Sequence, residues 1–243
     1  MNPILITGAT SGIGLQLAKD YAESGQTVYV CGRNAEKLQE LASLGSHVKP
    51  LQFDLTDLSS CKEALYDLDP IPLTWVLNAG DCEYIDEGVM DAALIKRVFT
   101  INVIGLANAI EGAQHHFVAG HHLVIVGSIA SEMALPRAEA YGASKAAVSY
   151  LSRTLGVDLA PKGIKVSTVF PGFVKTPLTD KNDFPMPMMI EVDEAARAIR
   201  EGIGSGKTNI YFPKRFTWIL RILGSLPYSV QHHLAKKLIK DKQ

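Results

Sequence analysis

The sequence predicts an α/β fold: a doubly wound parallel sheet of about seven strands flanked by helices, in a single domain that ends in a helical tail. Its length of 243 residues suits one such domain. Short apolar runs recur along the chain, with segments of helical apolar spacing between them. The runs do not alternate with polar residues, which is typical of strands buried on both faces of a parallel sheet. Repeated strand–helix alternation implies right-handed crossovers and hence an open sheet.

The expected strands follow one another at regular spacing. They are residues 4–6, 28–30, 48–53, 75–77, 123–126, 166–170 and, as a seventh, 209–212. Helical spacing is clear in the first two intervals, at 15–22 and 35–42. No linker or repeat interrupts the alternation, so we expect residues 1–213 to form one domain. Residues 214–243 are expected to add an amphipathic basic tail, as part of that domain or as an interface.

The composition excludes several classes of protein. A formal net charge of -1 gives no general attraction to nucleic acid, and we expect no nucleic-acid partner. The three cysteines, Cys31, Cys61 and Cys82, are too few and too scattered for a disulfide framework or a zinc site. The paired histidines lack acidic partners at ligand spacing, so no metal site is expected. We see no signal peptide and no run of about 18 uncharged apolar residues, which favours a cytoplasmic protein.

Residues 7–14, TGATSGIG, join the first expected strand to the first helix. Glycines at such a turn let the backbone approach a pyrophosphate closely, and the helix start offers unpaired N–H groups. The spacing G-x-x-x-G-x-G differs from the general G-x-G-x-x-G fingerprint. We therefore predict a Rossmann-type dinucleotide site at this turn.

The end of the second strand indicates which dinucleotide is preferred. Sites selective for NAD commonly carry a carboxylate there, whereas this chain reads Cys31-Gly32-Arg33-Asn34. An arginine can form charge-assisted hydrogen bonds with a 2′-phosphate. We expect NADP(H) to be preferred, with NAD(H) as the second cofactor. In the alternative, Arg33 only stacks on adenine or faces solvent.

Tyr141 and Lys145 are four residues apart on an expected helix, so both side chains can point into one site. An ammonium about 5 Å from a phenol, at an effective dielectric of about 20, would lower the phenol pKa by roughly two units. Ser128 and residues 78–80 follow strands that end at the same edge of the sheet. Asn102 lies in an apolar helix where its amide needs a partner, and a purely structural amide is the alternative.

With these motifs the sequence resembles the short-chain dehydrogenase/reductase family. The matching pieces, which occur in the family's order between residues 4 and about 178, are TGATSGIG, Asp54 in DLTD, NAG at 78–80, the Asn102 region, Ser128, YGASK at 141–145 and Pro171-Gly172. The resemblance implies a hydride transfer between a nicotinamide and a carbonyl or secondary alcohol. The alternative is a non-catalytic NADP-binding redox sensor or scaffold.

The resemblance also implies roles for individual residues. Tyr141 would be the acid–base residue, Lys145 would lower its pKa and hold the nicotinamide ribose, and Ser128 would position the substrate carbonyl. Asn102 would hold a water that links Lys145 to solvent. The implied cofactor contacts are Gly8, Ser11, Gly12, Ile13, Gly14, Arg33, Asp54, Leu55, Asn78, Ala79, Gly80, Tyr141, Lys145, Pro171, Gly172, Val174 and Thr176.

Two segments are expected to shape a substrate site, residues 129–139 and 178–190. The second holds the apolar run FPMPMM at 184–189, which favours a lid over an apolar small molecule; ordinary loop packing is the alternative.

The tail departs from the common family ending, which helps to form a tetramer. Residues 214–243 hold seven basic residues and one acid, and their apolar residues have helical spacing. Such a helix can pack on its own domain, on a partner subunit or on an anionic membrane surface. We expect a homo-oligomer, a dimer or a tetramer, with peripheral membrane contact as a further option.

Overall fold

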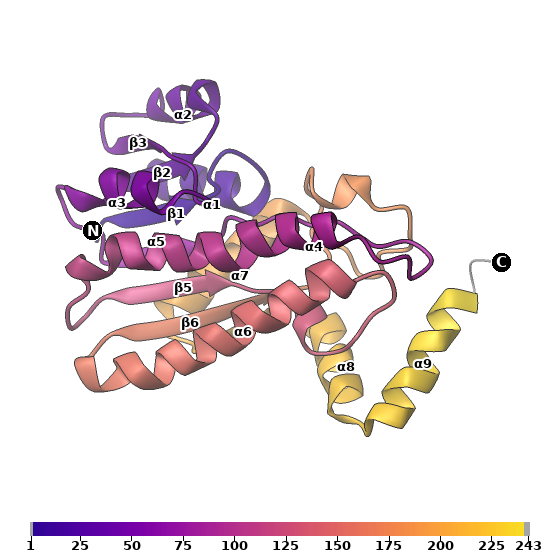
Figure 1. Ribbon diagram of the computed structural model, residues 1–243. Helices are drawn as coiled ribbons and strands as arrows, with labels where there is room; N and C mark the ends of the chain where they lie inside the picture. Colours follow the sequence, from indigo (N-terminus) through magenta and orange to yellow (C-terminus); the bar gives the residue numbers. More distant parts are fainter. Residues whose placement is uncertain (1, 241–243) are drawn as a thin grey trace.

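The computed structural model describes residues 2–240, so residue 1 of the expected domain and residues 241–243 of the expected tail lie outside the described residues. Seven parallel strands form one sheet in the order β3-β2-β1-β4-β5-β6-β7 (Figure 1). The strands are β1 (Ile4–Thr7), β2 (Val28–Gly32), β3 (Val48–Gln52), β4 (Thr74–Leu77), β5 (His122–Val126), β6 (Lys165–Pro171) and β7 (Asn209–Phe212). The predicted fold class is confirmed.

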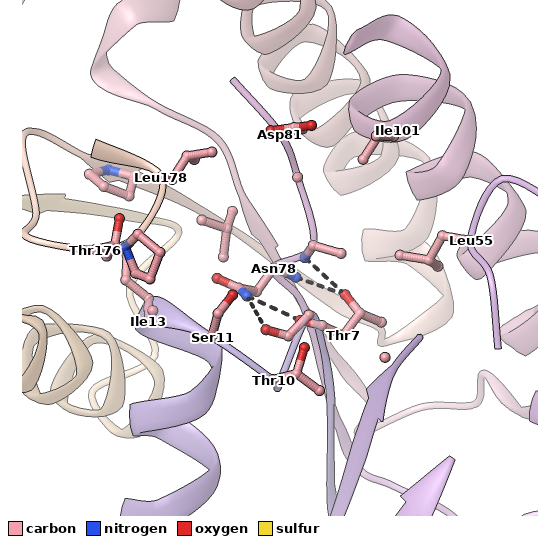
Figure 2. A pocket seen from close by; sticks show the side chains of 18 of the residues that line it. Thr7, Thr10, Ser11, Ile13, Leu55, Asn78, Asp81, Ile101, Thr176 and Leu178 are labelled. Atoms are coloured by element: carbon pink, nitrogen blue, oxygen red, sulfur yellow. Dashed lines mark hydrogen bonds between the residues drawn. The ribbon is translucent and has the colours of Figure 1, made fainter. Parts of the chain in front are cut away.

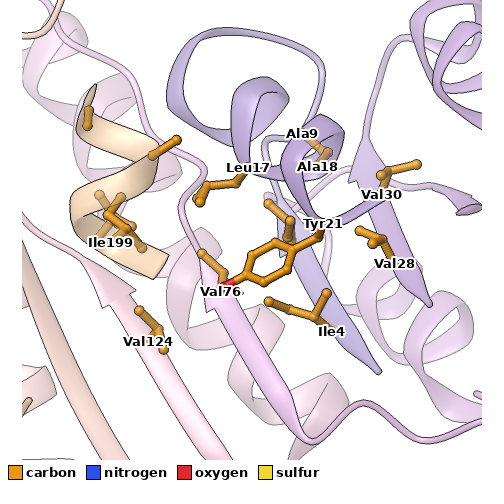
Figure 3. Packing of buried hydrophobic residues seen from close by; sticks show 14 of the residues in the cluster. Ile4, Ala9, Leu17, Ala18, Tyr21, Val28, Val30, Val76, Val124 and Ile199 are labelled. Atoms are coloured by element: carbon orange, nitrogen blue, oxygen red, sulfur yellow. The ribbon is translucent and has the colours of Figure 1, made fainter. Parts of the chain in front are cut away.

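The sheet separates two hydrophobic cores because alternate strand residues point to opposite faces. Ile4, Ile6 and Val76 face one core, whereas Leu5, Trp75 and Leu77 face the other. The first core packs on α1 (Gly12–Glu23), α2 (Ala35–Ala42) and α7 (Val192–Gly204). Tyr21, Leu17 and Ile199 fill the space between α1, α7 and the sheet (Figure 3).

The second core lies under the other helical layer. This helical layer comprises α3 (Leu58–Tyr66), α4 (Ala92–Phe99), α5 (Gly105–Ala113) and α6 (Glu139–Leu159). A π-helical turn, Thr100–Ile104, joins α4 to α5. By length and composition alone, the described helix Ala92–His116 could cross a membrane, with a mean hydropathy of 1.4. Its residues Leu106, Ala109 and Ala113 pack in the second core, as those of a helix covering a sheet do.

Helix starts are fixed by short polar side chains. Asn34, Asp57 and Asp91 precede α2, α3 and α4, and each accepts a hydrogen bond from a backbone N–H of the first turn. These caps explain why the helices begin directly after the polar residues that end each strand or loop.

The strand order reverses at β1, because β2 lies on one side of it and β4 on the other. In open α/β sheets, ligands bind at the carboxyl ends of the strands at such a switch point. The turn after β1 and the residue triplet after β4 therefore meet at the mouth of this crevice.

The C-terminal residues form a helical hairpin of α8 (Lys214–Ser225) and α9 (Tyr228–Lys240), which projects from the domain in Figure 1. Phe216 and Leu220 on α8 pack with Ile129 and Met133, which follow Ser128. The inner face of α8 thus packs on its own domain, close to a predicted catalytic residue. The division at residue 213 stays a prediction.

Candidate active site

A cleft of about 480 Å³ opens at the predicted edge of the sheet. All but one of the predicted cofactor contacts line it, namely Gly8, Ser11, Gly12, Ile13, Arg33, Asp54, Leu55, Asn78, Ala79, Gly80, Tyr141, Lys145, Pro171, Gly172, Val174 and Thr176. Gly14, Asn102 and Ser128 are not among the lining residues. Gly14 packs closely against Gly8, which does line the cleft. Asn102 and Ser128 are buried.

The glycine turn has the geometry that a close backbone approach requires. Gly8 and Gly12 have φ angles of +66° and +52°, a region that side-chain-bearing residues rarely adopt. A Cβ on Gly14 would collide with the carbonyl oxygen of Gly8, so only glycine fits there. The turn therefore leaves open backbone facing the cleft.

Asn78 fastens this turn to β4. Its side-chain amide donates to the carbonyl oxygen of Thr7 at 3.1 Å, and its backbone N–H donates to the Thr7 hydroxyl at 3.0 Å (Figure 2). The backbone N–H of Ala79 donates to the same hydroxyl at 3.1 Å. Thr7 was not among the predicted site residues, and its signal was a hydroxyl at the end of an otherwise apolar strand.

Arg33 and Asp54 line the cleft where the turns after β2 and β3 meet. Their charged atoms are 4.0 Å apart, and the Arg33 side chain is 70% exposed. Hydrogen bonds from the Thr56 backbone N–H and hydroxyl, together with the Arg33 charge, hold the pKa of Asp54 below its usual value. Arg33 is thus a cation at the cleft rim with most of its surface open to solvent.

Tyr141 and Lys145 occupy the start of α6, as the spacing predicts. The Lys145 Nζ lies 5.9 Å from the centre of the Tyr141 ring and donates to the carbonyl oxygen of Val126 at 3.0 Å. Lys145 is only 5% exposed, so this carbonyl fixes an ammonium that is almost fully removed from water. The two side chains therefore share one buried corner of the cleft.

Asn102 connects this corner to the loop after β4. Its Oδ1 accepts from the backbone N–H of Asp81 at 2.7 Å, and its Nδ2 donates to the Asp81 carbonyl at 2.9 Å and the Ser144 hydroxyl at 2.9 Å. Both Asn102 Oδ1 and Lys145 Nζ lie against Gly80, where an added Cβ would be 3.0 Å and 3.2 Å from them. The buried amide of Asn102 therefore has hydrogen-bond partners for both its oxygen and its nitrogen.

The pKa of Tyr141 differs from the expectation. Burial raises it above the usual value for a phenol, the nearby Cys82 adds to this, and a hydrogen bond with Ser128 opposes it. Burial also lowers the pKa of Lys145 to about 8. The pKa of Tyr141 is therefore raised where the sequence predicted a lowering, because the cost of removing a phenolate from water exceeds the stabilisation by the hydrogen bond with Ser128.

The two predicted substrate segments contact each other and the loop after β4, and only the 178–190 segment contributes residues to the cleft lining. The Arg137 guanidinium pairs with Asp86 at 2.7 Å and also with Asp183 of the 178–190 segment. Phe184 meets Tyr84 edge to face, with ring centres 5.3 Å apart. These contacts hold the 178–190 segment against the loop after β4. The residues are far apart in sequence, so the sequence alone did not predict their pairing.

A glycine turn between β1 and α1, with Tyr141 and Lys145 in one corner of the same cleft, indicates a dinucleotide-binding oxidoreductase. The model of the short chain dehydrogenase family matches residues 2–185. The chain is 32% identical to an oxidoreductase of Myxococcus xanthus (strain DK1622) that is described as uncharacterized, over 96% of each sequence. It belongs to the short-chain dehydrogenase family and is an oxidoreductase.

Two further relatives carry more specific descriptions. One is the NADPH-dependent 1-acyldihydroxyacetone phosphate reductase of Saccharomyces cerevisiae (strain ATCC 204508 / S288c), with 28% identity over 84% of this chain and 70% of the relative. The other is a short-chain dehydrogenase from Sphingobium yanoikuyae, solved in complex with NADPH. It has a TM-score of 0.80 and 27% identity, over 94% of this chain and 98% of that one.

Proposed function

We propose that this protein is an NADP(H)-dependent reductase or dehydrogenase that acts on a carbonyl or secondary alcohol in apolar surroundings. The observation that carries the proposal is the pair formed by the half-buried Tyr141 and the buried Lys145, which both line the cleft. A phenol and an ammonium held together in a cleft serve proton transfer, and a protein that only binds a dinucleotide has no need of them.

The residues of the cleft fit a dinucleotide. The turn at Gly8, Gly12 and Gly14 exposes its backbone because an added Cβ at these positions would meet neighbouring atoms closely. Asn78 holds this turn in place through its hydrogen bond to Thr7. When bound, the nicotinamide supplies or accepts the hydride. Gly8, Ser11, Gly12 and Ile13 would hold the pyrophosphate, with Gly14 keeping the helix close, and Lys145 would bind the nicotinamide ribose.

The preference for NADP(H) rests on the cation at the end of β2. Arg33 can pair with a 2′-phosphate, and no carboxylate follows β2 to repel one. The yeast relative is NADPH-dependent and the Sphingobium structure contains NADPH, which supports the same choice. NAD(H) would bind the rest of the cleft without this contact.

In the reduction, Tyr141 gives its proton to the carbonyl oxygen, and in the oxidation it takes the proton from the alcohol. The raised pKa of Tyr141 keeps the phenol protonated at neutral pH, which suits the reduction. The Ser128 hydroxyl would hold the substrate oxygen. Lys145 and Asn102 beside Gly80 would return a proton to Tyr141 through water.

The Tyr141→Phe variant tests the proposal. We expect NADPH oxidation, measured over a panel of aldehydes, ketones and diketones with NADH as control, to fall by at least about 100-fold. NADPH binding, followed by its fluorescence, should persist. Tyr150→Phe is the matched control, since Tyr150 lies on the same helix and is 76% exposed. Full activity of Tyr141→Phe, or no turnover by the wild type over the whole panel, would favour the redox sensor or scaffold.

A further inference from the structure

Outside the cleft, one face of α8 combines apolar and cationic side chains in solvent. Arg215, Trp218, Ile219 and Ile222 follow the spacing i, i+3, i+4, i+7, which places them on one side of the helix. Trp218 is 62% exposed, and Ile219 and Ile222 are each 41% exposed. The opposite side of α8, with Phe216 and Leu220, is the one that packs on the domain.

The 178–190 segment extends this face. A shallow groove of about 520 Å³ is lined by Met188 and Met189 together with Lys214 and Arg215 at the start of α8. Met188 and Met189 are 50% and 43% exposed. Glu194 is the acid among the lining residues, against two cations. Two segments far apart in sequence thus form one apolar surface with a basic rim.

Positive charge is concentrated in the same C-terminal hairpin. Residues 214–240 contain six Lys or Arg and no Asp or Glu. The whole chain has a net charge of -1, so the remainder is acidic while the hairpin is strongly basic. A negatively charged surface would attract the hairpin and repel most of the domain, which orients the protein.

We propose that the docking surface formed by Met188, Met189, Lys214, Arg215, Trp218, Ile219 and Ile222 binds an anionic phospholipid bilayer. Tryptophan and long aliphatic side chains enter the boundary between headgroups and acyl chains, and the flanking cations pair with anionic lipids. A second copy fits less well, because a twofold interface pairs the same surface of both subunits and would bring two patches with Lys214 and Arg215 close together.

Docking in this way would place the 178–190 segment at the bilayer. That segment borders the cleft, where Leu178 and Lys181 are lining residues. An apolar substrate would then reach Tyr141 from the lipid phase without crossing water. This consequence rests on the proposed function, whereas the docking itself does not.

Tryptophan fluorescence reports directly on the docking surface. The chain has two tryptophans; Trp75 is fully buried and Trp218 is exposed. On addition of vesicles of phosphatidylcholine with phosphatidylserine we expect a blue shift of Trp218 emission and quenching by brominated lipid. Pure phosphatidylcholine should produce little change, high salt should weaken the effect, and Trp218→Phe should abolish it.

Paired variants separate the charged and apolar contributions. Each cation near an anionic bilayer contributes about fivefold in partitioning, so Lys214→Gln/Arg215→Gln should lower vesicle binding by about 25-fold. Ile219→Ser/Ile222→Ser should lower it by at least about 10-fold while retaining the Trp218 signal. Lys19→Gln/Lys207→Gln is the matched control, with the same charge change at two exposed sites on α1 and before β7.

Circular dichroism and NADPH binding should show that all variants are folded, and turnover of a water-soluble carbonyl should stay at the wild-type level. Loss of that turnover in Tyr141→Phe would concern the proposed function alone.

The docking proposal is overturned if anionic vesicles change neither emission nor sedimentation, or if the control pair weakens binding equally. A dimer that Ile219→Ser/Ile222→Ser dissociates, without lipid binding by the wild type, would assign the surface to a second copy instead.

Discussion

At the scale of single residues, the proposed cofactor preference depends on Arg33. Its side chain stands at the cleft rim 4.0 Å from Asp54, exposed enough to reach a 2′-phosphate. Charge-assisted hydrogen bonds contribute about 1.5–3 kcal/mol, so Arg33→Glu should lower kcat/KM for NADPH by roughly 10- to 100-fold. The value for NADH should change little. Equal losses with both cofactors would mean that Arg33 does not contact the 2′ position.

A second residue-scale prediction concerns His122, whose ring nitrogen lies 2.7 Å from the Ser167 hydroxyl. Burial, helped by the Lys165 charge, lowers the His122 pKa to about 4. Between pH 6.5 and 4 the unfolded chain therefore binds a proton that the folded chain does not, and the free energy of unfolding falls as the pH falls. Urea unfolding of His122→Gln should lose less stability over this range, by on the order of 2 kcal/mol. His232→Gln, at an exposed position, should behave like the wild type.

At the scale of elements, α8 is tied to the loop that follows Ser128. A Cβ on Gly224 would collide with the carbonyl oxygen of Glu132, so Gly224→Ala must displace either α8 or that loop. We expect a loss of about 1–3 kcal/mol in unfolding free energy and a higher KM for the carbonyl substrate, with the Kd of NADPH unchanged. Gly204→Ala at the end of α7 is the control, because a Cβ there meets nothing within 4 Å. Unchanged KM and stability in Gly224→Ala would separate α8 from the substrate site.

At the scale of the whole molecule, the cleft draws residues from the turns after each of the strands β1 to β6 and from α6. A ligand bound there should stabilise the sheet and both helical layers together. NADPH at about 100 times its Kd should add about 2.7 kcal/mol and raise the Tm by about 5 to 10 °C. Arg33→Glu should reduce the shift with NADPH more than the shift with NADH. No shift with either cofactor would contradict the assignment of the cleft.

Much of this molecule could be predicted from its sequence, because the relevant signals are local. The apolar runs locate all seven strands, and TGATSGIG places the turn where Gly8 and Gly12 have positive φ. The i, i+4 spacing puts Tyr141 and Lys145 in one corner. Each of these depends only on neighbouring residues and on the handedness of crossovers.

Other features could not be predicted, because they depend on contacts between segments that are distant in sequence. The contact of Thr7 with Asn78, the pairing of Arg137 with Asp183 and the approach of Gly224 to Glu132 join segments distant in sequence. The pKa of Tyr141 was expected to fall and instead rises, because its sign depends on how completely the phenol is buried. Burial of that degree follows from tertiary packing.

The burial of all three cysteines has a practical consequence. Burial raises the pKa of Cys31 far above its usual value and those of Cys61 and Cys82 to about 11, so none is a ready thiolate at neutral pH. Alkylating reagents should therefore spare the native chain. A cysteine introduced at Ser229, exposed at the start of α9, would be the one fast-reacting thiol of the described residues and could carry a spin label or dye. The hairpin can thus be followed spectroscopically without first removing any native sulfur.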